Sequence, residues 1–446
     1  MIYMGLIAFF FLEYVRPIAY YPGLTALHLN TIVPLLTGAS SIVTAGSATT
    51  ARVVRDPNFL MLLTMLGLIL VSFFMADVQM LAWNTFTVEL GFGLVTWIIA
   101  NEVTTIGKFK GVIVALVGAH IAVAFYNPLL FTDPETRHYL TSGSFLGDGN
   151  DFSLSIVIVL PLCLFVLLET RRVVAKIVWA FVIVVLVAGV VVTQSRGGTV
   201  GLACMAAYFW AKSQKKAQTG FVMALVFALI LALAPGNYFA RMSMISDTTE
   251  GSASARLTAW GVAIRMAIDN PLLGVGVGNF GTKIGNEYRP AGFVGVGMNA
   301  HSIYFSALGE MGFPGLILLL SFIGWNLREN QRLALELKAR GSPHHTELQL
   351  LSSLSAALIA FASAGAFLSA LYYPHLYVVA GLLTAGRHVV RQKLDAASSA
   401  PSHAVVAPAA SSIHWALRPL PRPSAPPTVI RPRLAPPLVG GARPRQ

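Results

Sequence analysis

The sequence predicts an all-α integral membrane protein with many transmembrane helices, and its composition is the first reason. Of the 446 residues, 55% are hydrophobic and only 11% are charged, whereas a soluble domain carries about 25% charged residues. The mean hydropathy is +0.69, and the hydrophobic residues gather in long runs. These features exclude a soluble globular enzyme, a disordered protein and a disulfide-stapled secreted domain.

Twelve apolar stretches approach the roughly 20 residues that a membrane-spanning helix needs. The first has no basic segment before it and no small-residue cleavage site, so we expect it to be retained as a span. Both cysteines, Cys163 and Cys204, lie in apolar runs and are interpreted as small buried hydrophobic residues. In chain order, the predicted spans are residues 1–15, 23–45, 59–76, 81–100, 111–131, 152–169, 174–193, 197–211, 219–235, 301–325, 350–370 and 372–390.

The basic residues predict which side each connection faces. Seventeen Lys and Arg fall in alternate connections, whereas the opposite short connections hold three, Arg16, Arg137 and Arg196. Because basic residues favour cytoplasmic loops, we expect both termini in the cytoplasm and the loops at 132–150 and 236–300 on the outer face. The net charge of +12 is therefore interpreted as membrane topology, and no nucleic-acid partner is expected.

Residues 394–446 differ from the predicted multi-span domain at 1–393. Eleven of the 24 prolines follow position 400, with Ala and Arg between them. A segment of this composition cannot bury enough apolar surface to fold. We therefore expect a disordered cytoplasmic tail.

Arg196 is a basic residue on the outer side, where the charge pattern leaves few. It lies in the stretch 193–199, and the two glycines that follow it allow a close approach of the backbone or a break in the helix. One interpretation is an interfacial Arg that reaches the headgroups. The other is an anion-binding Arg at the membrane surface.

The large outer loop contains a predicted helix at 255–268, which Asp-Asn-Pro ends. Arg256 and Trp260 are four residues apart and share a face, whereas Arg265 lies half a turn away from Arg256. One helix therefore cannot aim both arginines at the same ligand. The alternative is an amphipathic helix on the lipid surface, with Trp260 as an interfacial anchor or a platform for a sugar.

The glycine-rich stretch 274–281 follows that helix. It is weak as a nucleotide-binding fingerprint because no strand precedes it, and it indicates a tightly turned loop. His301 then opens a span at the outer edge, where an Arg-lined pocket would make it a candidate base. Glu310 lies about two turns deeper and is either a functional acid or a helix-packing hydrogen-bond partner.

The other outer loop ends at residues 147–152. Asp151 or Asn150 is placed to cap the next span, and a catalytic role for Asp151 stays open. Three polar residues inside spans are interpreted as buried hydrogen-bond partners, since their spacing does not join them into a metal site: His28, Glu89 and His120.

Four groups of residues occur in a familiar order. They are Gly143-Ser-Phe-Leu-Gly-Asp-Gly-Asn-Asp-Phe152, Ser195-Arg-Gly-Gly198, Arg256…Trp260 followed by Asn270-Pro-Leu-Leu-Gly-Val-Gly-Val-Gly-Asn-Phe280, and His301-Ser-Ile-Tyr…Leu308-Gly-Glu-Met-Gly312. With this order and its large outer loop before the last spans, the chain resembles the O-antigen ligase and O-antigen polymerase superfamily of bacterial inner membranes. The resemblance covers roughly residues 140–325.

The resemblance implies a metal-independent glycosyltransferase that needs no cofactor and works on the outer face. Such an enzyme takes a glycan from polyprenyl diphosphate and joins it to a hydroxyl. The acceptor is the lipid A core in the ligase branch, which we place first, and another lipid-linked glycan in the polymerase branch. Direct attack would invert the anomeric centre, and membrane lipid surrounds the enzyme.

By position, the resemblance assigns Arg196 and Arg256 to the diphosphate and His301 to the acceptor hydroxyl. The loop that contains Arg289 is the right one, but that residue does not align securely. Ser302 stands where the family often has Asn, which leaves the acceptor open. Supporting roles are expected for Glu310, Arg265, Arg289, Asp151 and Trp260.

Two other classes of function stay open at this point. A secondary transporter or flippase would suit twelve spans and intramembrane acids, but no matching pair of broken spans is found in the two halves. A membrane scaffold with a lipid-binding loop is the other. Alanine at Arg256 and His301 would abolish transfer in an enzyme, reduce flux in a transporter and change neither in a scaffold.

Overall fold

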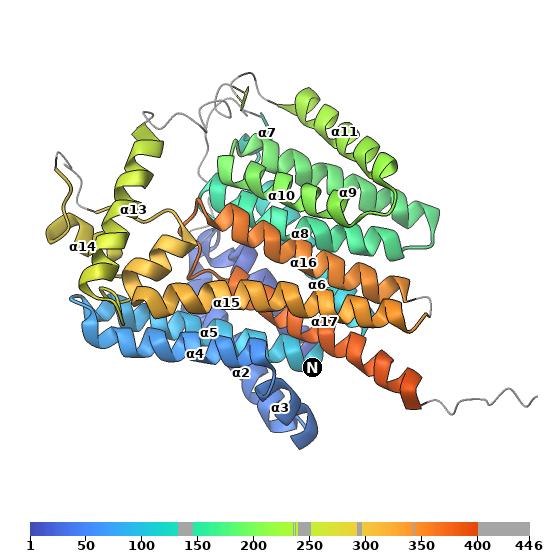
Figure 1. Ribbon diagram of the computed structural model, residues 1–446, viewed down its shortest axis with the longest axis horizontal. Helices are drawn as coiled ribbons and strands as arrows, with labels where there is room; N and C mark the ends of the chain where they lie inside the picture. Colours follow the sequence, from blue (N-terminus) through green and yellow to red (C-terminus); the bar gives the residue numbers. More distant parts are fainter. Residues whose placement is uncertain are drawn as a thin grey trace, which may run out of the picture. The chain divides into compact units, whose positions relative to one another are not determined.

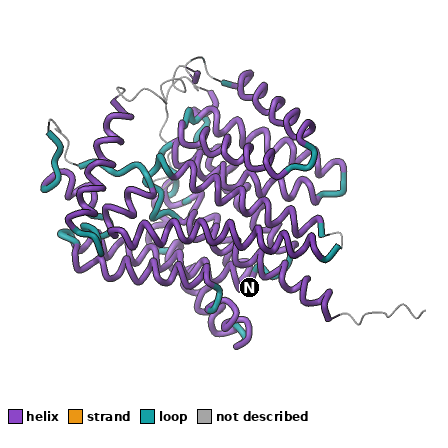
Figure 2. Tube along the Cα trace, viewed as in Figure 1, coloured by secondary structure: helices purple, strands orange, loops and turns teal. Residues whose placement is uncertain are grey.

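A computed structural model of the chain confirms the predicted fold class. It is all-helical, and no strand occurs among the described residues (Figures 1 and 2). The chain divides into two units, Met1–Ser398 and Ser399–Gln446. The structure describes residues 1–132, 146–234, 236, 238–239, 251–291, 297–341 and 344–399.

The α-helices follow one another along the first unit. Their bounds are α1 Ile2–Phe10, α2 Leu29–Thr44, α3 Ser47–Val54, α4 Pro57–Ser72, α5 Gln79–Glu102, α6 Ile106–Tyr126, α7 Leu129–Thr132, α8 Gly149–Glu169, α9 Val173–Val192, α10 Arg196–Lys212, α11 Lys216–Leu233, α13 Gly251–Asp269, α14 Phe280–Asn286, α15 Ile303–Ala339, α16 His345–Gly365 and α17 Pro374–Ser399. Shorter helical turns lie at Phe11–Val15, Pro17–Ala19, Pro22–Leu27 and Phe73–Met75.

Each of the twelve predicted spans coincides with helical structure, and the chain is a polytopic membrane protein. Among the described residues, eight segments are long and apolar enough to cross a membrane, so the number twelve stays a prediction. They are Ile2–Ala19, Pro22–Thr44, Pro57–Met75, Ile106–Tyr126, Gly149–Glu169, Val173–Val192, Ile303–Ala339 and His345–Gly365.

Helix α6 begins and ends five residues before the predicted span 111–131, and two other helices continue well beyond their predicted ends. The helix expected to end near 325 continues to Ala339, and α17 continues to Ser399, past the expected start of the tail at 394. Both extensions carry charged residues, so they do not belong to the apolar runs that predict the spans. The remainder of the predicted tail, 400–446, lies outside the described residues.

Helix α15 has a break at Gly312, whose φ is +68° and ψ is −164°. Pro314 follows, and Phe313 N donates to Pro271 O at 3.0 Å. The 27 residues after the break are about 40 Å long at 1.5 Å per residue, which exceeds the roughly 30 Å hydrocarbon core of a bilayer. We therefore expect this helix to tilt in the bilayer or to extend beyond its hydrocarbon core.

Close packing fixes the start of α10 against α8 and α16. A Cβ on Gly201 would lie 3.0 Å from Ala364 Cβ and 3.2 Å from Val157 Cγ2, and a Cβ on Gly198 would overlap Ser153 Oγ. Only glycine permits such an approach without displacement of a neighbour. The Gly-Gly pair that follows Arg196 thus sets the position of this arginine relative to two neighbouring helices.

The glycine-rich loop after α13 is clamped, as the sequence predicts for a tight turn. Gly274, Gly276 and Gly278 have φ of +64°, +91° and +75°. A Cβ on Gly274 would lie 2.5 Å from Gly309 O, and Val277 N donates to Ser72 Oγ at 3.1 Å. The loop is therefore held between α15 and the end of α4.

Replacing Gly274 by Ala should lower the free energy of unfolding by about 1–3 kcal/mol, because the new Cβ meets backbone atoms in a left-handed conformation. Thermal unfolding of the purified protein in detergent measures this. Gly118→Ala is the matched control, since nothing lies within 4 Å of its Cβ position. Equal melting temperatures for the two variants would show that the loop is not clamped.

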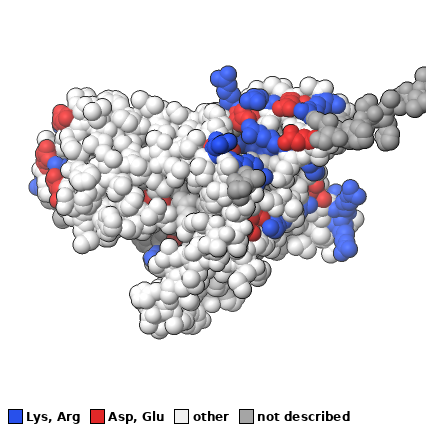
Figure 3. All heavy atoms as spheres, turned by 90° about the horizontal axis from the view of Figure 1, so that it is seen from below, with Lys and Arg blue, Asp and Glu red and all other residues white. Residues whose placement is uncertain are grey.

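Polar and charged side chains join the second halves of α15 and α17. These halves lie away from α13 and α14 (Figure 1). Arg387 is fully buried, donates to Asn326 Oδ1 at 2.7 Å and lies 3.7 Å from Asp56 Oδ1. Arg391 lies 2.5 Å from Glu329 Oε1. On the face drawn in Figure 3, most Lys and Arg gather toward one end.

Candidate functional site

Arg196 is the first residue of α10 and is half-buried. The preceding Gln194 has a left-handed φ of +51°, and Ser195 caps the helix by accepting from Gly198 N at 3.1 Å. Because a left-handed conformation is uncommon outside glycine, such residues are often found at functional sites. The turn therefore holds the base of the Arg196 side chain at the helix N-terminus.

His301 is exposed just before α15 and also has a left-handed φ, +49°. Its backbone N donates to Ser369 Oγ at 2.8 Å. Ser302, which follows, is fully buried at the start of the helix. The backbone around the histidine is thus fixed while its imidazole ring faces outward.

Trp260 joins α13 to the start of α15. Its ring stacks on Phe305, with centroids 4.8 Å apart and planes 13° apart, and its Nε1 donates to Ala300 O at 2.9 Å. Residues 259, 262, 263 and 266 on α13 are buried in the same cluster. The helix packs on the protein by this face, and the anchor of Trp260 at the lipid interface stays a prediction.

One short segment at the end of α16 and just after it, residues 364–369, lies beside Gly197, Trp260 and the backbone of His301. A Cβ on Gly197, next to Arg196, would lie 3.3 Å from Ala364 O and 3.5 Å from Phe367 Cβ. The rings of Phe367 and Trp260 are 6.5 Å apart, and Arg256 lies one turn before Trp260 on α13. With the Ser369 bond to His301 N, the structure brings Arg196, the Arg256 turn and His301 to one region.

The start of α8 adds two acids to this region. Asp148, not Asp151 or Asn150, caps the helix, because Asn150 N donates to Asp148 Oδ1 at 3.0 Å. Asp151 instead accepts from Tyr373 Oη at 3.2 Å. The predicted cap was wrong because two acids three residues apart both suit a helix start.

Glu310 is buried and supports the glycine-rich loop. Its Oε1 accepts from Phe280 N, the first residue of α14, at 3.0 Å. The Glu310 backbone O also accepts from Gly276 N at 3.2 Å. These contacts match the hydrogen-bonding interpretation of this acid and place it between α15 and α14.

Arg265 and Arg289 lie together but apart from the region around His301. Both are exposed, and both line a pocket of about 360 Å³ between α13 and the end of α14. The lining of this pocket does not include Arg196, Arg256 or His301. Arg265, which is predicted to lie half a turn away from Arg256 on the same helix, therefore lines a pocket that Arg256 does not line.

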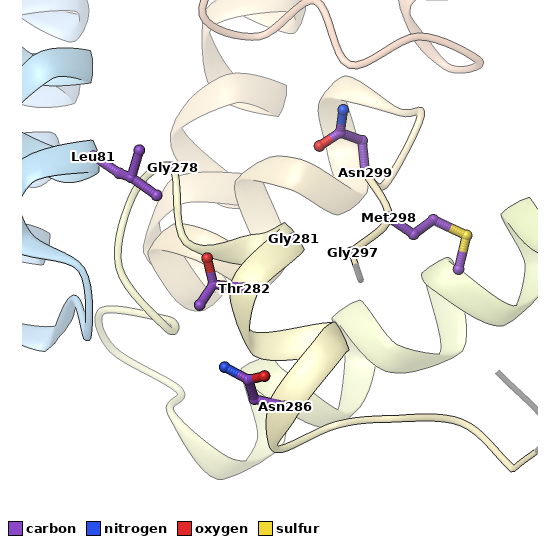
Figure 4. A pocket seen from close by; sticks show the side chains of 8 residues that line it. All are labelled: Leu81, Gly278, Gly281, Thr282, Asn286, Gly297, Met298 and Asn299. Atoms are coloured by element: carbon purple, nitrogen blue, oxygen red, sulfur yellow. The ribbon is translucent and has the colours of Figure 1, made fainter. Parts of the chain in front are cut away.

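A second pocket, of about 560 Å³, lies between α14 and the stretch that leads to His301. Its lining supplies hydroxyl and amide groups without a charged side chain, and Thr282 and Asn286 leave α14 on the same side (Figure 4). The sequence analysis did not find it, since its polar residues have no characteristic spacing. The lining residues are Leu81, Gly278, Gly281, Thr282, Asn286, Gly297, Met298 and Asn299.

The residues missed by sequence analysis, Ser369 and Tyr373, lie between α16 and α17. Each bonds to a residue at least 68 positions away, a relation that no local pattern reveals. Within the described ranges, no group of three or more His, Cys, Asp or Glu side chains is arranged to hold a metal ion.

The fold defines a polytopic helical membrane protein in which the segment 364–369 lies beside Gly197, Trp260 and the backbone of His301. Residues 181–320 match the family model of O-antigen ligase, and this part contains Arg196, Arg256 and His301. This match supports the O-antigen ligase superfamily predicted from sequence. No curated protein matches the chain. The family implies glycosyltransferase-like activity, with a lipid-linked glycan donor and an acceptor.

Proposed function

We propose that this protein transfers a glycan from polyprenyl diphosphate to an acceptor hydroxyl at the outer face of the bacterial inner membrane, with both termini in the cytoplasm. One observation carries the proposal. Three separate stretches carry Arg196, Arg256 and His301, and each has a residue beside 364–369. These residues are Gly197, Trp260 and His301 itself. The family match over 181–320 supports the same reaction class.

The chemistry follows from these side chains. The bond between the anomeric carbon and the diphosphate oxygen breaks, and the negative charge that develops on the diphosphate needs stabilisation. Arg196 and Arg256 supply it by charge-assisted hydrogen bonds, and the positive end of the α10 dipole adds to the field at Arg196. No metal or cofactor takes part in the proposed step.

His301 receives the proton as the acceptor oxygen forms its bond to the anomeric carbon. A positioned general base contributes about 10²–10⁴-fold to such a reaction. Direct attack opposite the leaving diphosphate inverts the anomeric centre. The neutral pocket that includes Asn299, two residues before His301, provides hydroxyl and amide partners for sugar hydroxyls.

The lipid A core is the first acceptor to test, because the matched family model is that of the ligase. The purified protein is placed in lipid with a polyprenyl diphosphate-linked glycan, with and without lipid A core. Product only with the core supports a ligase, and longer lipid-linked chains from donor alone support a polymerase. If folded protein forms neither while it carries the donor across a vesicle membrane, the transferase proposal is wrong and a flippase replaces it.

Ser369→Ala should slow transfer by up to about tenfold, since a hydrogen bond of roughly 0.5–1.5 kcal/mol that fixes His301 is lost. Ser369→Thr retains a hydroxyl and should restore most of the rate. The measurement is kcat and KM for the donor, with the loss expected in kcat. A lowered melting temperature with unchanged kcat would indicate that Ser369 is only structural.

A further inference from the structure

The pocket between α13 and α14 has a charge arrangement that the transfer step leaves unused. Its six lining residues combine two cations, two acids, a phenol and one apolar side chain. The pocket encloses about 360 Å³, enough room for one sugar-sized group. The lining residues are Arg265, Ile268, Asp269, Glu287, Tyr288 and Arg289.

The two acids have other partners. Glu287 Oε2 lies 2.6 Å from Lys283 Nζ, which also lies 2.9 Å from Asp77 Oδ2. Asp269 faces the Tyr288 hydroxyl, and burial followed by this carboxylate raises the pKa of Tyr288. The acids in the lining are thus held by groups other than the pocket arginines.

The two arginines are not paired in this way. Neither forms an ion pair with a residue that the structure describes, and Arg289 uses only its Nε, which donates to Gly285 O at 2.8 Å. The terminal nitrogens of its planar fork stay available for a carboxylate or phosphate, which such a fork binds in bidentate fashion. Both side chains are exposed, so a ligand can reach them.

The pocket is built on a packed support. Ala263, Met266, Ile284 and Tyr288 belong to the cluster that joins α13 to α14. Arg265 is nine residues from Arg256, about 13 Å along α13 and on the opposite side of the helix. The pocket is therefore fixed relative to the transfer site but does not belong to it.

We infer that this pocket is a second glycan subsite, which binds a sugar carrying a carboxylate or phosphate group. The arginines bind the anionic group, and the Asp269 and Glu287 carboxylates accept from neighbouring sugar hydroxyls. The inference rests on the proposed function for the identity of the ligand as a glycan. Under this inference, the glycans that the protein recognises contain a sugar with an anionic group.

Binding is tested with full-length protein in phosphatidylcholine nanodiscs and fluorescent tetragalacturonic acid as the probe. We expect the double variant Arg265→Gln and Arg289→Gln to raise the Kd by at least about tenfold. The matched control, Arg171→Gln with Arg172→Gln, removes two exposed positive charges elsewhere and should leave the Kd unchanged. The Kd for maltotetraose, which is neutral, should be the same for the two double variants.

Lipid headgroups present the same anionic chemistry, so nanodiscs with phosphatidylglycerol form a second arm. If the pocket variant loses only its interaction with this lipid and binds tetragalacturonic acid normally, the glycan subsite is overturned. Equal Kd values for both double variants also overturn it. Because binding needs no transfer, retained binding in a protein without transferase activity would refute the proposed function alone.

Discussion

We expect the His301→Asn variant to lose transfer activity by about 100- to 10,000-fold while remaining folded, because it lacks the proposed base. Asparagine tolerates the left-handed backbone that His301 adopts, so the loss reports on the imidazole rather than on strain. The measurement is the single-turnover rate with saturating donor and acceptor. Melting temperatures of variant and parent should agree.

His28→Asn is the matched control for this experiment. His28 is exposed and left-handed, with φ of +44°, so its interpretation as a buried hydrogen-bond partner is wrong. It has no place in the proposed site. It should retain the parent rate. Full activity in the His301 variant would mean that another group, or water, takes the proton.

The second large effect is expected for Arg196→Lys, which should lower kcat by about 100- to 1,000-fold, the usual cost of removing a donor that stabilises a developing oxyanion. Lysine keeps the charge but lacks the planar fork that binds a diphosphate oxygen pair. The assay is transfer from the polyprenyl diphosphate-linked glycan. Its readout separates kcat from the KM of the donor.

Arg172→Lys makes the same chemical change at an exposed position before α9 and should leave kcat unaltered. A rise in donor KM with unchanged kcat at position 196 would show that Arg196 binds the ground state only. An Arg196→Lys enzyme with parent values for both constants would remove this residue from the proposed mechanism.

The helices were predictable because lipid leaves few alternatives for a long apolar run. The predicted spans and the helix at 255–268 all appear as helices, and the loop at 274–281 is tightly turned. Charged extensions were harder to predict, as α15 shows beyond 325. There, helix formation depends on buried polar contacts such as that of Asn326 with Arg387.

The residue types of the candidate site were predictable from the sequence, but the residues that hold them in place were not. Arg196 stands out because basic residues are rare on the predicted outer side. Arg196 and His301 also lie next to glycine or serine, which are typical of turns. Ser369 and Tyr373 have ordinary local sequence, and their importance arises from contacts with distant residues. The separation of Arg265 from Arg256 followed from helix periodicity alone, whereas the pairing of Arg265 with Arg289 needed the fold.

The position of Ser369 has a consequence for chimeric proteins and for biosynthesis. The family-matching region ends at residue 320, yet the hydroxyl that holds His301 is at residue 369. A chimera that carries residues 181–320 in a relative would contain Arg196, Arg256 and His301. It would lack Ser369, whose hydroxyl holds the His301 backbone. During synthesis the site is also completed late, since the segment after α16 must emerge before the histidine turn is secured.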